Sequence, residues 1–106
     1  MIKEMLIKNG GLTLNKKGQP IILKTGYQVS IYDCAKILLK DFNDKIVKQL
    51  ADKINRGEYV GLWIDGGYVY ADISKRIATK KDAYQKGKEL KQLAIFNWKR
   101  NESLYL

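Results

Sequence analysis

The sequence predicts an α+β domain: a mainly antiparallel sheet built from hairpins, with about two amphipathic helices packed on one face. Two alternating runs around a Gly-Gly pair, at 58–74, indicate a long hairpin. Apolar residues at helical spacing after Asn43 and small residues at similar spacing after Thr79 indicate the helices. A chain of 106 residues fits one core, so residues 1–106 are expected to form a single domain.

The first hairpin is expected near the N-terminus. The stretch Asn15 to Gly18 has the composition of a turn, with a glycine available for a positive φ angle. It separates two short strand-like runs, Leu12 to Leu14 and Ile21 to Leu23. After the KTG turn, the run YQVSIY predicts a further strand, because it alternates and contains β-branched residues.

The middle of the chain predicts one clear helix. Residues 33–42 are compatible with a short helix, a continued strand or a loop. Asn43 is then a suitable N-cap, and Asp44 is favourable in a first helical turn. Apolar residues recur at helical spacing before Gly57, namely Ile46, Val47, Leu50, Ala51 and Ile54. We therefore expect a helix from Asp44 to Arg56.

The run EYVGLWIDGGYVYADIS has two different faces when it is read as a hairpin. With Gly66 and Gly67 in the turn, the pattern pairs Asp65 with Tyr68, Trp63 with Tyr70, and Gly61 with Asp72. One face is wholly apolar and is expected to lie in the core, namely Val60, Leu62, Ile64, Val69, Ala71 and Ile73. The other face carries an aromatic row, Tyr59, Trp63, Tyr68 and Tyr70, flanked by Asp65 and Asp72.

The C-terminal third predicts a second helix and a closing hairpin. Thr79 and Asp82 have the spacing of a capping box. A narrow stripe of small or apolar residues is expected to pack on the sheet, namely Ala83, Gly87, Leu90 and Ala94. The opposite side presents Lys81, Tyr84, Lys88 and Lys91. The runs LAIFNW and SLYL, separated by the polar KRNE, then read as the last hairpin.

The residue inventory favours a binder over an enzyme. The chain has no histidine and one cysteine, so the usual transition-metal clusters cannot be assembled and no metal or cofactor is expected. It contains no nucleophile elbow or phosphate-cradling glycine loop, and its acidic residues are scattered. Cys34 alone cannot form an intramolecular disulfide, and no run is long enough to span a membrane. We therefore expect a non-enzymatic, cytoplasmic protein.

The charge and the aromatic residues suggest two binding surfaces. With 20 Lys and Arg against 11 Asp and Glu, the net charge of +9 favours polyanions. The stripe of Lys81, Tyr84, Lys88 and Lys91 is either a polyanion-binding surface or an ordinary solvated face. The row of Trp63, Tyr68 and Tyr70 could stack bases, be covered by the protein itself, or contact another protein. Asp65 and Asp72 weigh against phosphates at this row.

Several segments together resemble a family of small proteins and domains carried by phages and other mobile elements. They are NGGLTLNKKGQP, TGYQVS, YVGLWIDGGYVYADIS and DAYQKGKELKQLAIFNW, which cover most of the chain. Lys91 departs from the pattern, because a polar residue such as asparagine is expected there. The resemblance supplies no catalytic residues. It implies an accessory protein that acts on nucleic acid or on a nucleic-acid-bound host complex, or alternatively an anti-CRISPR inhibitor that binds a host effector protein directly.

Overall fold

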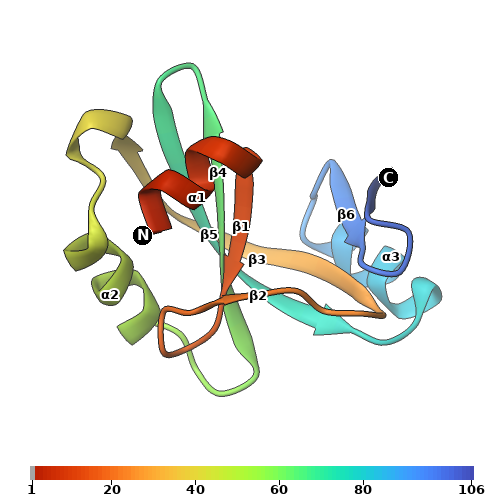
Figure 1. The fold of residues 1–106 in the computed structure, drawn as a ribbon. Helices are drawn as coiled ribbons and strands as arrows, with labels where there is room; N and C mark the ends of the chain where they lie inside the picture. The colour runs from red at the N-terminus through yellow and green to blue at the C-terminus, as the bar shows by residue number, and fades with distance from the viewer. Residues whose placement is uncertain (1) are drawn as a thin grey trace.

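One antiparallel sheet organises the chain in a computed structural model that describes residues 2–106. Within these residues seven strands pair in the order β2-β1-β4-β5-β3-β6-β7 (Figure 1). In chain order the elements are α1 (Ile2–Asn9), β1 (Gly11–Leu14), β2 (Pro20–Ile21), β3 (Tyr27–Leu38), a 3₁₀ turn (Leu39–Asp41), α2 (Asp44–Asp52), β4 (Glu58–Asp65), β5 (Tyr68–Ile77), α3 (Lys80–Glu89), β6 (Ala94–Asn97) and β7 (Glu102–Tyr105).

The β4–β5 hairpin has the predicted register. Asp65 pairs with Tyr68, Trp63 with Tyr70, and Gly61 with Asp72. Gly66 and Gly67 have φ angles of 57° and 80°, which suit a tight turn that requires two positive φ values. Five of the six predicted core residues are buried, namely Val60, Leu62, Val69, Ala71 and Ile73, and Ile64 near the turn is half-buried. The predicted faces of the hairpin are therefore confirmed.

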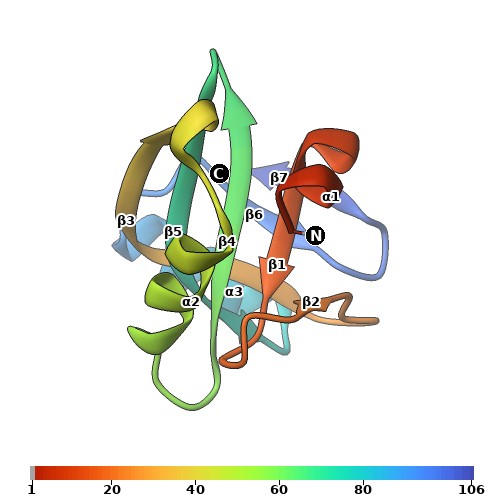
Figure 2. The same ribbon diagram turned by 60° about the vertical axis from the view of Figure 1, so that its left-hand side comes forward.

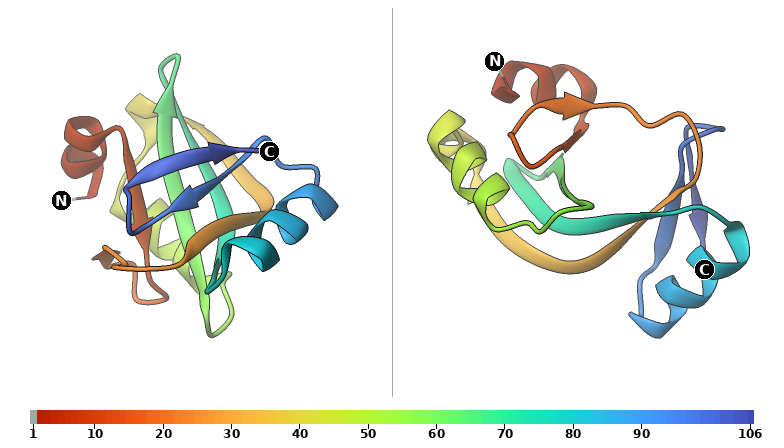
Figure 3. Two further views of the ribbon diagram at one scale, coloured as in Figure 1. Left: turned by 90° about the vertical axis from the view of Figure 1, so that its right-hand side faces the viewer. Right: turned by 90° about the horizontal axis from the view of Figure 1, so that it is seen from below.

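The sheet is strongly curved, and β3 contributes to the curvature. Its pairing with β5 is interrupted by register shifts between Ser30 and Tyr32 and between Asp33 and Ala35. Such bulges bend a strand and increase its twist. The curve of β3 and β5 is visible in Figure 3 (right), where α1 and α2 lie toward one end and α3 toward the other. For residues 33–42, which had several possible structures, the chain continues β3 to Leu38 and then makes the 3₁₀ turn.

Helices α1 and α2 cover the larger core. Leu6 of α1 and Val47 and Leu50 of α2 pack with the buried face of the β4–β5 hairpin. The Asn43 side chain accepts a hydrogen bond from the Ile46 N–H at 3.1 Å, so the predicted N-cap is confirmed. The predicted end at Arg56 is wrong, because α2 stops at Asp52. Residues 55–58 instead form a turn into β4, closed by backbone and side-chain bonds between Asn55 and Glu58.

Helix α3 covers a second, smaller core with β6 and β7. Thr79 caps the helix by accepting a hydrogen bond from the Asp82 N–H at 3.3 Å. Gly87 is required for close packing, because a Cβ there would lie 2.7 Å from the Leu106 side chain. The predicted stripe extended too far, since α3 ends at Glu89 and Ala94 belongs to β6. The closing hairpin of β6 and β7 forms as predicted.

The α+β class and the mainly antiparallel sheet are therefore confirmed, whereas the helices form two groups. Residues 2–106 contain three α-helices, of which α1 was not predicted. Helices α1 and α2 share one hydrophobic cluster, and α3 packs on another at the far end of β3 and β5 (Figure 1). None of the helices within residues 2–106 is long and apolar enough to cross a bilayer.

Candidate functional site: a basic end and an aromatic sheet face

Helix α3 has a basic side and an acidic side. Residues three and four positions apart share a helix surface, so one side carries Lys80, Lys81, Tyr84 and Lys88. The other side carries Asp82, Lys86 and Glu89, where Lys86 and Glu89 form an ion pair at 3.7 Å. Lys81 and Lys88 are exposed. The predicted stripe is therefore a surface from which the helix's own acidic residues are turned away.

Tyr84 is already engaged by neighbours on this basic side. Its hydroxyl donates a hydrogen bond to the carbonyl oxygen of Tyr105 at 3.2 Å, which ties α3 to β7. The Nζ atoms of Lys80 and Lys88 lie 5.8 and 5.7 Å from its ring centroid, within the range of cation–π attraction. Tyr84 therefore positions the helix and its lysines.

Lys91 lies outside the helix, although the sequence placed it on the same stripe. It follows the C-cap Leu90 and has a φ of 58°, in the left-handed region that terminates many helices. Its N–H donates to the Lys88 carbonyl at 3.0 Å, so the residue is held directly behind the last turn. The side chain is exposed, and Lys91 extends the basic side past the end of α3.

Most of the net charge falls within one stretch of the chain that includes α3 and β6. Between residues 75 and 100 the acids are Asp82 and Glu89, giving a net +7 of the total +9. The bases in that span are Lys75, Arg76, Lys80, Lys81, Lys86, Lys88, Lys91, Lys99 and Arg100. Within residues 2–106 only Lys86 and Arg100 of this group form ion pairs, the latter with Glu102 at 3.1 Å. We call the surface formed by the exposed bases of this span the basic end.

The aromatic row lies on the sheet face opposite the larger core. Trp63 and Tyr70 are stacked across β4 and β5, with ring centroids 5.5 Å apart and planes 12° apart. Tyr68 follows at 6.4 Å from Tyr70. Trp63 is 37% exposed, and both tyrosines are half-buried. The row is therefore partly covered by its own packing and partly open.

Lys36 is a member of this face that sequence reasoning missed. It pairs with Tyr70 in the sheet, and its Nζ lies 4.3 Å from the Tyr68 ring centroid. Leu38 pairs with Tyr68 and is 39% exposed. Neither residue could be placed without the register of β3 against β5, which depends on the two bulges.

An acidic group borders the aromatic row. Burial raises the pKa of Asp72 to about 6, the Ser30 hydroxyl and the Gly61 N–H lower it, and the charge of Asp33 raises it. Asp33 is the residue that pairs with Asp72 across the sheet. Ser30 lies close enough to lower the pKa of Asp72. Its hydroxyl oxygen is buried and makes no hydrogen bond of normal geometry within residues 2–106. At pH values above about 6, Asp72 therefore places a negative charge beside the row.

The two groups of predicted binding residues do not form one site. The tip of the β4–β5 hairpin and α3 lie at different ends of the molecule in Figure 1, and in Figure 2 the tip stands at the top while α3 lies behind the sheet. Lys81, Lys88 and Lys91 belong to the basic end, with Tyr84 as their support. Trp63, Tyr68 and Tyr70 belong to the sheet face near the hairpin tip.

Comparison with protein-family models, curated proteins and solved structures finds no significant match. Within the described chain, residues 2–106, no three His, Cys, Asp or Glu side chains converge in the way a metal site requires. The candidate surfaces are therefore characterised by charge, exposure and packing alone.

Proposed function

We propose that the protein is a non-enzymatic nucleic-acid-binding protein that uses the basic end to contact phosphates. The observation that carries this proposal is the net charge of +7 between residues 75 and 100. Seven of the nine bases in that span have no carboxylate partner within residues 2–106. They can approach phosphates without first giving up an ion pair.

Binding of this kind gains free energy from the counterions that the lysines release from the nucleic acid. It positions the protein on the backbone and reads no bases, so sequence preference is expected to be weak. Helix α3 presents Lys81 and Lys88 on one side, with Tyr84 bonded to Tyr105 beneath them. A fixed helix lowers the entropy cost of bringing several lysines to one strand.

The resemblance to accessory proteins of mobile elements is consistent with this role. A protein that coats nucleic acid, or that competes for it with a host complex, would protect an incoming element without catalysis. The charge of +9 also makes mimicry of DNA an unsuitable mechanism, because a mimic needs an acidic surface.

A salt titration tests the proposal. Labelled single-stranded and double-stranded oligonucleotides of unrelated sequence are titrated with the protein at increasing salt, with fluorescence anisotropy as the readout. We expect affinity to fall linearly on a log–log scale, with a slope of about −0.7 to −0.9 per phosphate contacted. Failure to bind at low salt, or binding that is indifferent to salt, would contradict the proposal.

The aromatic sheet face favours a second candidate function, direct binding to a host effector protein. Trp63 and Leu38 are both partly exposed on this face, and aromatic residues are common anchors at protein interfaces. A pull-down from host lysate with and without nuclease separates the two. A stoichiometric partner that survives nuclease and is lost with Trp63→Ala supports the protein partner. A partner that disappears with nuclease supports nucleic acid.

A further inference from the structure

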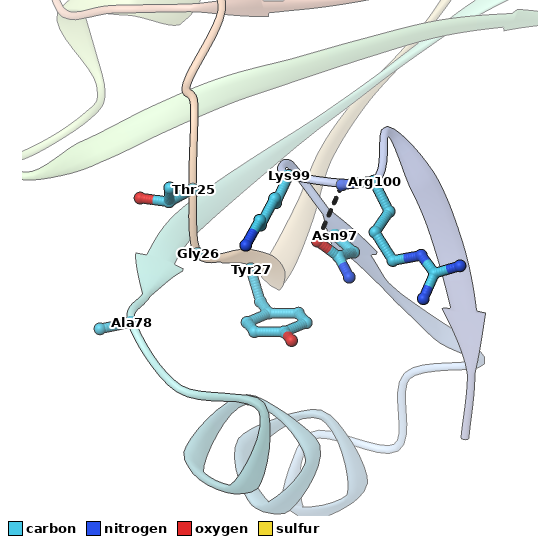
Figure 4. Close-up of a pocket in the computed structure, with 7 residues that line it drawn as sticks. All are labelled: Thr25, Gly26, Tyr27, Ala78, Asn97, Lys99 and Arg100. Carbon is cyan, nitrogen blue, oxygen red and sulfur yellow. Dashed lines mark hydrogen bonds between the residues drawn. The ribbon is translucent and has the colours of Figure 1, made fainter.

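An open hollow of about 500 Å³ lies at the basic end, between the start of β3, the end of β5 and the β6–β7 turn (Figure 4). Its lining includes Gly26, Asn97 and Lys99. The lining contains no carboxylate, although Arg100 at its edge is paired with Glu102. The hollow is thus a concave, donor-rich part of a surface that is otherwise formed by exposed lysines.

Asn97 presents an unused donor to this hollow. The residue is only 7% exposed, and its Oδ1 accepts a hydrogen bond from the Arg100 N–H at 3.3 Å. That bond fixes which end of the amide faces inward, and Figure 4 shows the nitrogen pointing away from it, into the space beside Tyr27. Within residues 2–106 no acceptor pairs with Nδ2. This nitrogen is not fully enclosed by protein, so it is a donor that a ligand in the hollow can reach.

Lys99 lines the same space, and Arg76 contacts its Thr25–Gly26 wall without lining the space itself. Lys99 extends toward Gly26 and Tyr27 in Figure 4. Arg76 is fixed beside Gly26, because its guanidinium donates to the Thr25 carbonyl and hydroxyl oxygens, both at 2.9 Å. A Cβ on Gly26 would lie 2.7 Å from the Arg76 Nε, so only glycine allows this guanidinium to lie against the backbone. An amide donor and a lysine ammonium therefore lie at the same hollow.

We infer that this hollow is a binding site for a single phosphate group. The phosphodiester group of a nucleic acid offers only acceptor oxygens, which matches an amide donor beside a lysine ammonium. The inference rests on the proposed function, because it identifies where one phosphate of the bound nucleic acid is held. The same chemistry could come from a free phosphate or a mononucleotide, and the test separates these sources.

The direct test follows the Asn97 side-chain NH₂ signal by ¹H–¹⁵N NMR. Wild-type protein is titrated with inorganic phosphate, with a deoxynucleoside 5′-monophosphate and with a short oligonucleotide, and sodium chloride at matched ionic strength is the control. We expect a saturable shift with all three phosphates and none with chloride. An Asn97 signal that moves equally with chloride, or does not move, overturns the inference. A shift with the small phosphates alone overturns its link to nucleic acid.

A matched pair of variants tests the donor. Asn97→Asp keeps the acceptor for the Arg100 N–H and replaces the inward NH₂ by an oxygen, whereas Asn101→Asp makes the same charge change in the neighbouring turn, where the residue is exposed. We expect Asn97→Asp to weaken inorganic-phosphate binding about tenfold or more relative to Asn101→Asp. Equal affinities overturn the site.

Two further controls keep the outcomes separate. If Asn97→Asp does not fold, the exposed Lys99→Ala is compared with Lys45→Ala, which is exposed at the start of α2. Loss of phosphate binding in Lys99→Ala alone supports the site, and equal affinities overturn it. If oligonucleotides bind in a salt-dependent way but phosphate does not shift the Asn97 signal, this inference is refuted and the proposed function is left intact. Absence of oligonucleotide binding refutes the proposed function, whatever the phosphate titration gives.

Discussion

The carboxyl group of Asp72 occupies the space that a side chain on Gly61 would fill. The two residues pair directly across β4 and β5, and a Cβ built on Gly61 would collide with the Asp72 Oδ1. Glycine at position 61 thus makes room for an acid within the sheet, between Tyr59 and Trp63 on the same face of β4. This relationship makes the stability of the sheet sensitive to both residues.

We expect Gly61→Ala to lower the free energy of unfolding by about 1–3 kcal/mol, because the added methyl group forces Asp72 or the backbone to shift. In an Asp72→Ala background the same change should be neutral or stabilising by up to about 1 kcal/mol, since alanine is favoured over glycine in a strand. Urea denaturation of the four proteins measures the coupling. An equal cost of Gly61→Ala in both backgrounds would show that the contact is not responsible.

The raised pKa of Asp72 predicts a pH-dependent stability. Its folded-state pKa of about 6 lies above the usual value of 3.8, so between these values the folded protein binds the proton more tightly than the unfolded chain. The contribution of Asp72 is therefore most favourable at low pH and is lost as pH rises through about 6. Asp72→Asn, which resembles the protonated form, should stabilise the protein by roughly 2–3 kcal/mol at pH 8.

Asp72→Asn should have little effect on the free energy of unfolding near pH 4, because the wild-type carboxyl is already protonated in the folded state at that pH. Urea denaturation at the two pH values, compared with Asp65→Asn on the exposed end of the hairpin, isolates the effect. A pH-independent effect of Asp72→Asn would contradict the assignment of the raised pKa.

The sequence predicted those parts of the fold that depend on local patterns. The β4–β5 hairpin follows from strict alternation around two glycines. A shift of the strand pairing by one residue would move every side chain to the opposite face of the sheet. Helix α1 was missed because Leu6 is its only buried residue, so Ile2–Asn9 shows little amphipathic pattern. The end of α3 was misplaced because Lys91, a residue that rarely adopts a left-handed conformation, stops the helix where no glycine marks it.

The candidate site was predictable only where it lies on one element. Lys81, Tyr84 and Lys88 share one side of α3 by their spacing alone. Lys36 and Asp33 required the pairing of β3 with β5, and the two bulges make that register unreadable from the chain. The hollow required the β6–β7 turn to meet the Thr25–Gly26 turn, a contact between segments about 70 residues apart, and no local pattern encodes it.

Tyr84 is predicted to support the basic end without contacting the ligand. Tyr84→Phe removes the hydrogen bond to the Tyr105 carbonyl and should lower the free energy of unfolding by about 1 kcal/mol. It should leave the salt slope of oligonucleotide binding unchanged, because no charge is lost. Tyr105→Phe is the control, since it removes a hydroxyl from a side chain that is 77% exposed. A changed salt slope in Tyr84→Phe would show that the hydroxyl takes part in binding.

Trp63→Ala is predicted to affect stability and leave nucleic-acid binding unchanged. It removes the stack on Tyr70, which should cost about 0.5–1.5 kcal/mol beyond the lost burial. Oligonucleotide affinity should match that of Tyr32→Ala, an exposed aromatic of β3 outside the row. If the row stacks bases instead, affinity should fall by roughly 1–3 kcal/mol for each base lost. Anisotropy titrations of the two variants distinguish these results.

The most direct test of the central claim is the salt slope of oligonucleotide binding in a triple variant of the basic end. Lys81, Lys88 and Lys91 are replaced by alanine, and the control replaces three lysines around the start of α2, namely Lys40, Lys45 and Lys48. Both variants lose the same charge. If α3 and Lys91 contact phosphates, the first should flatten the slope by about two to three units of log K per log salt, and the control should leave it nearly unchanged. Equal slopes in the two variants would contradict the assignment of nucleic-acid binding to the basic end.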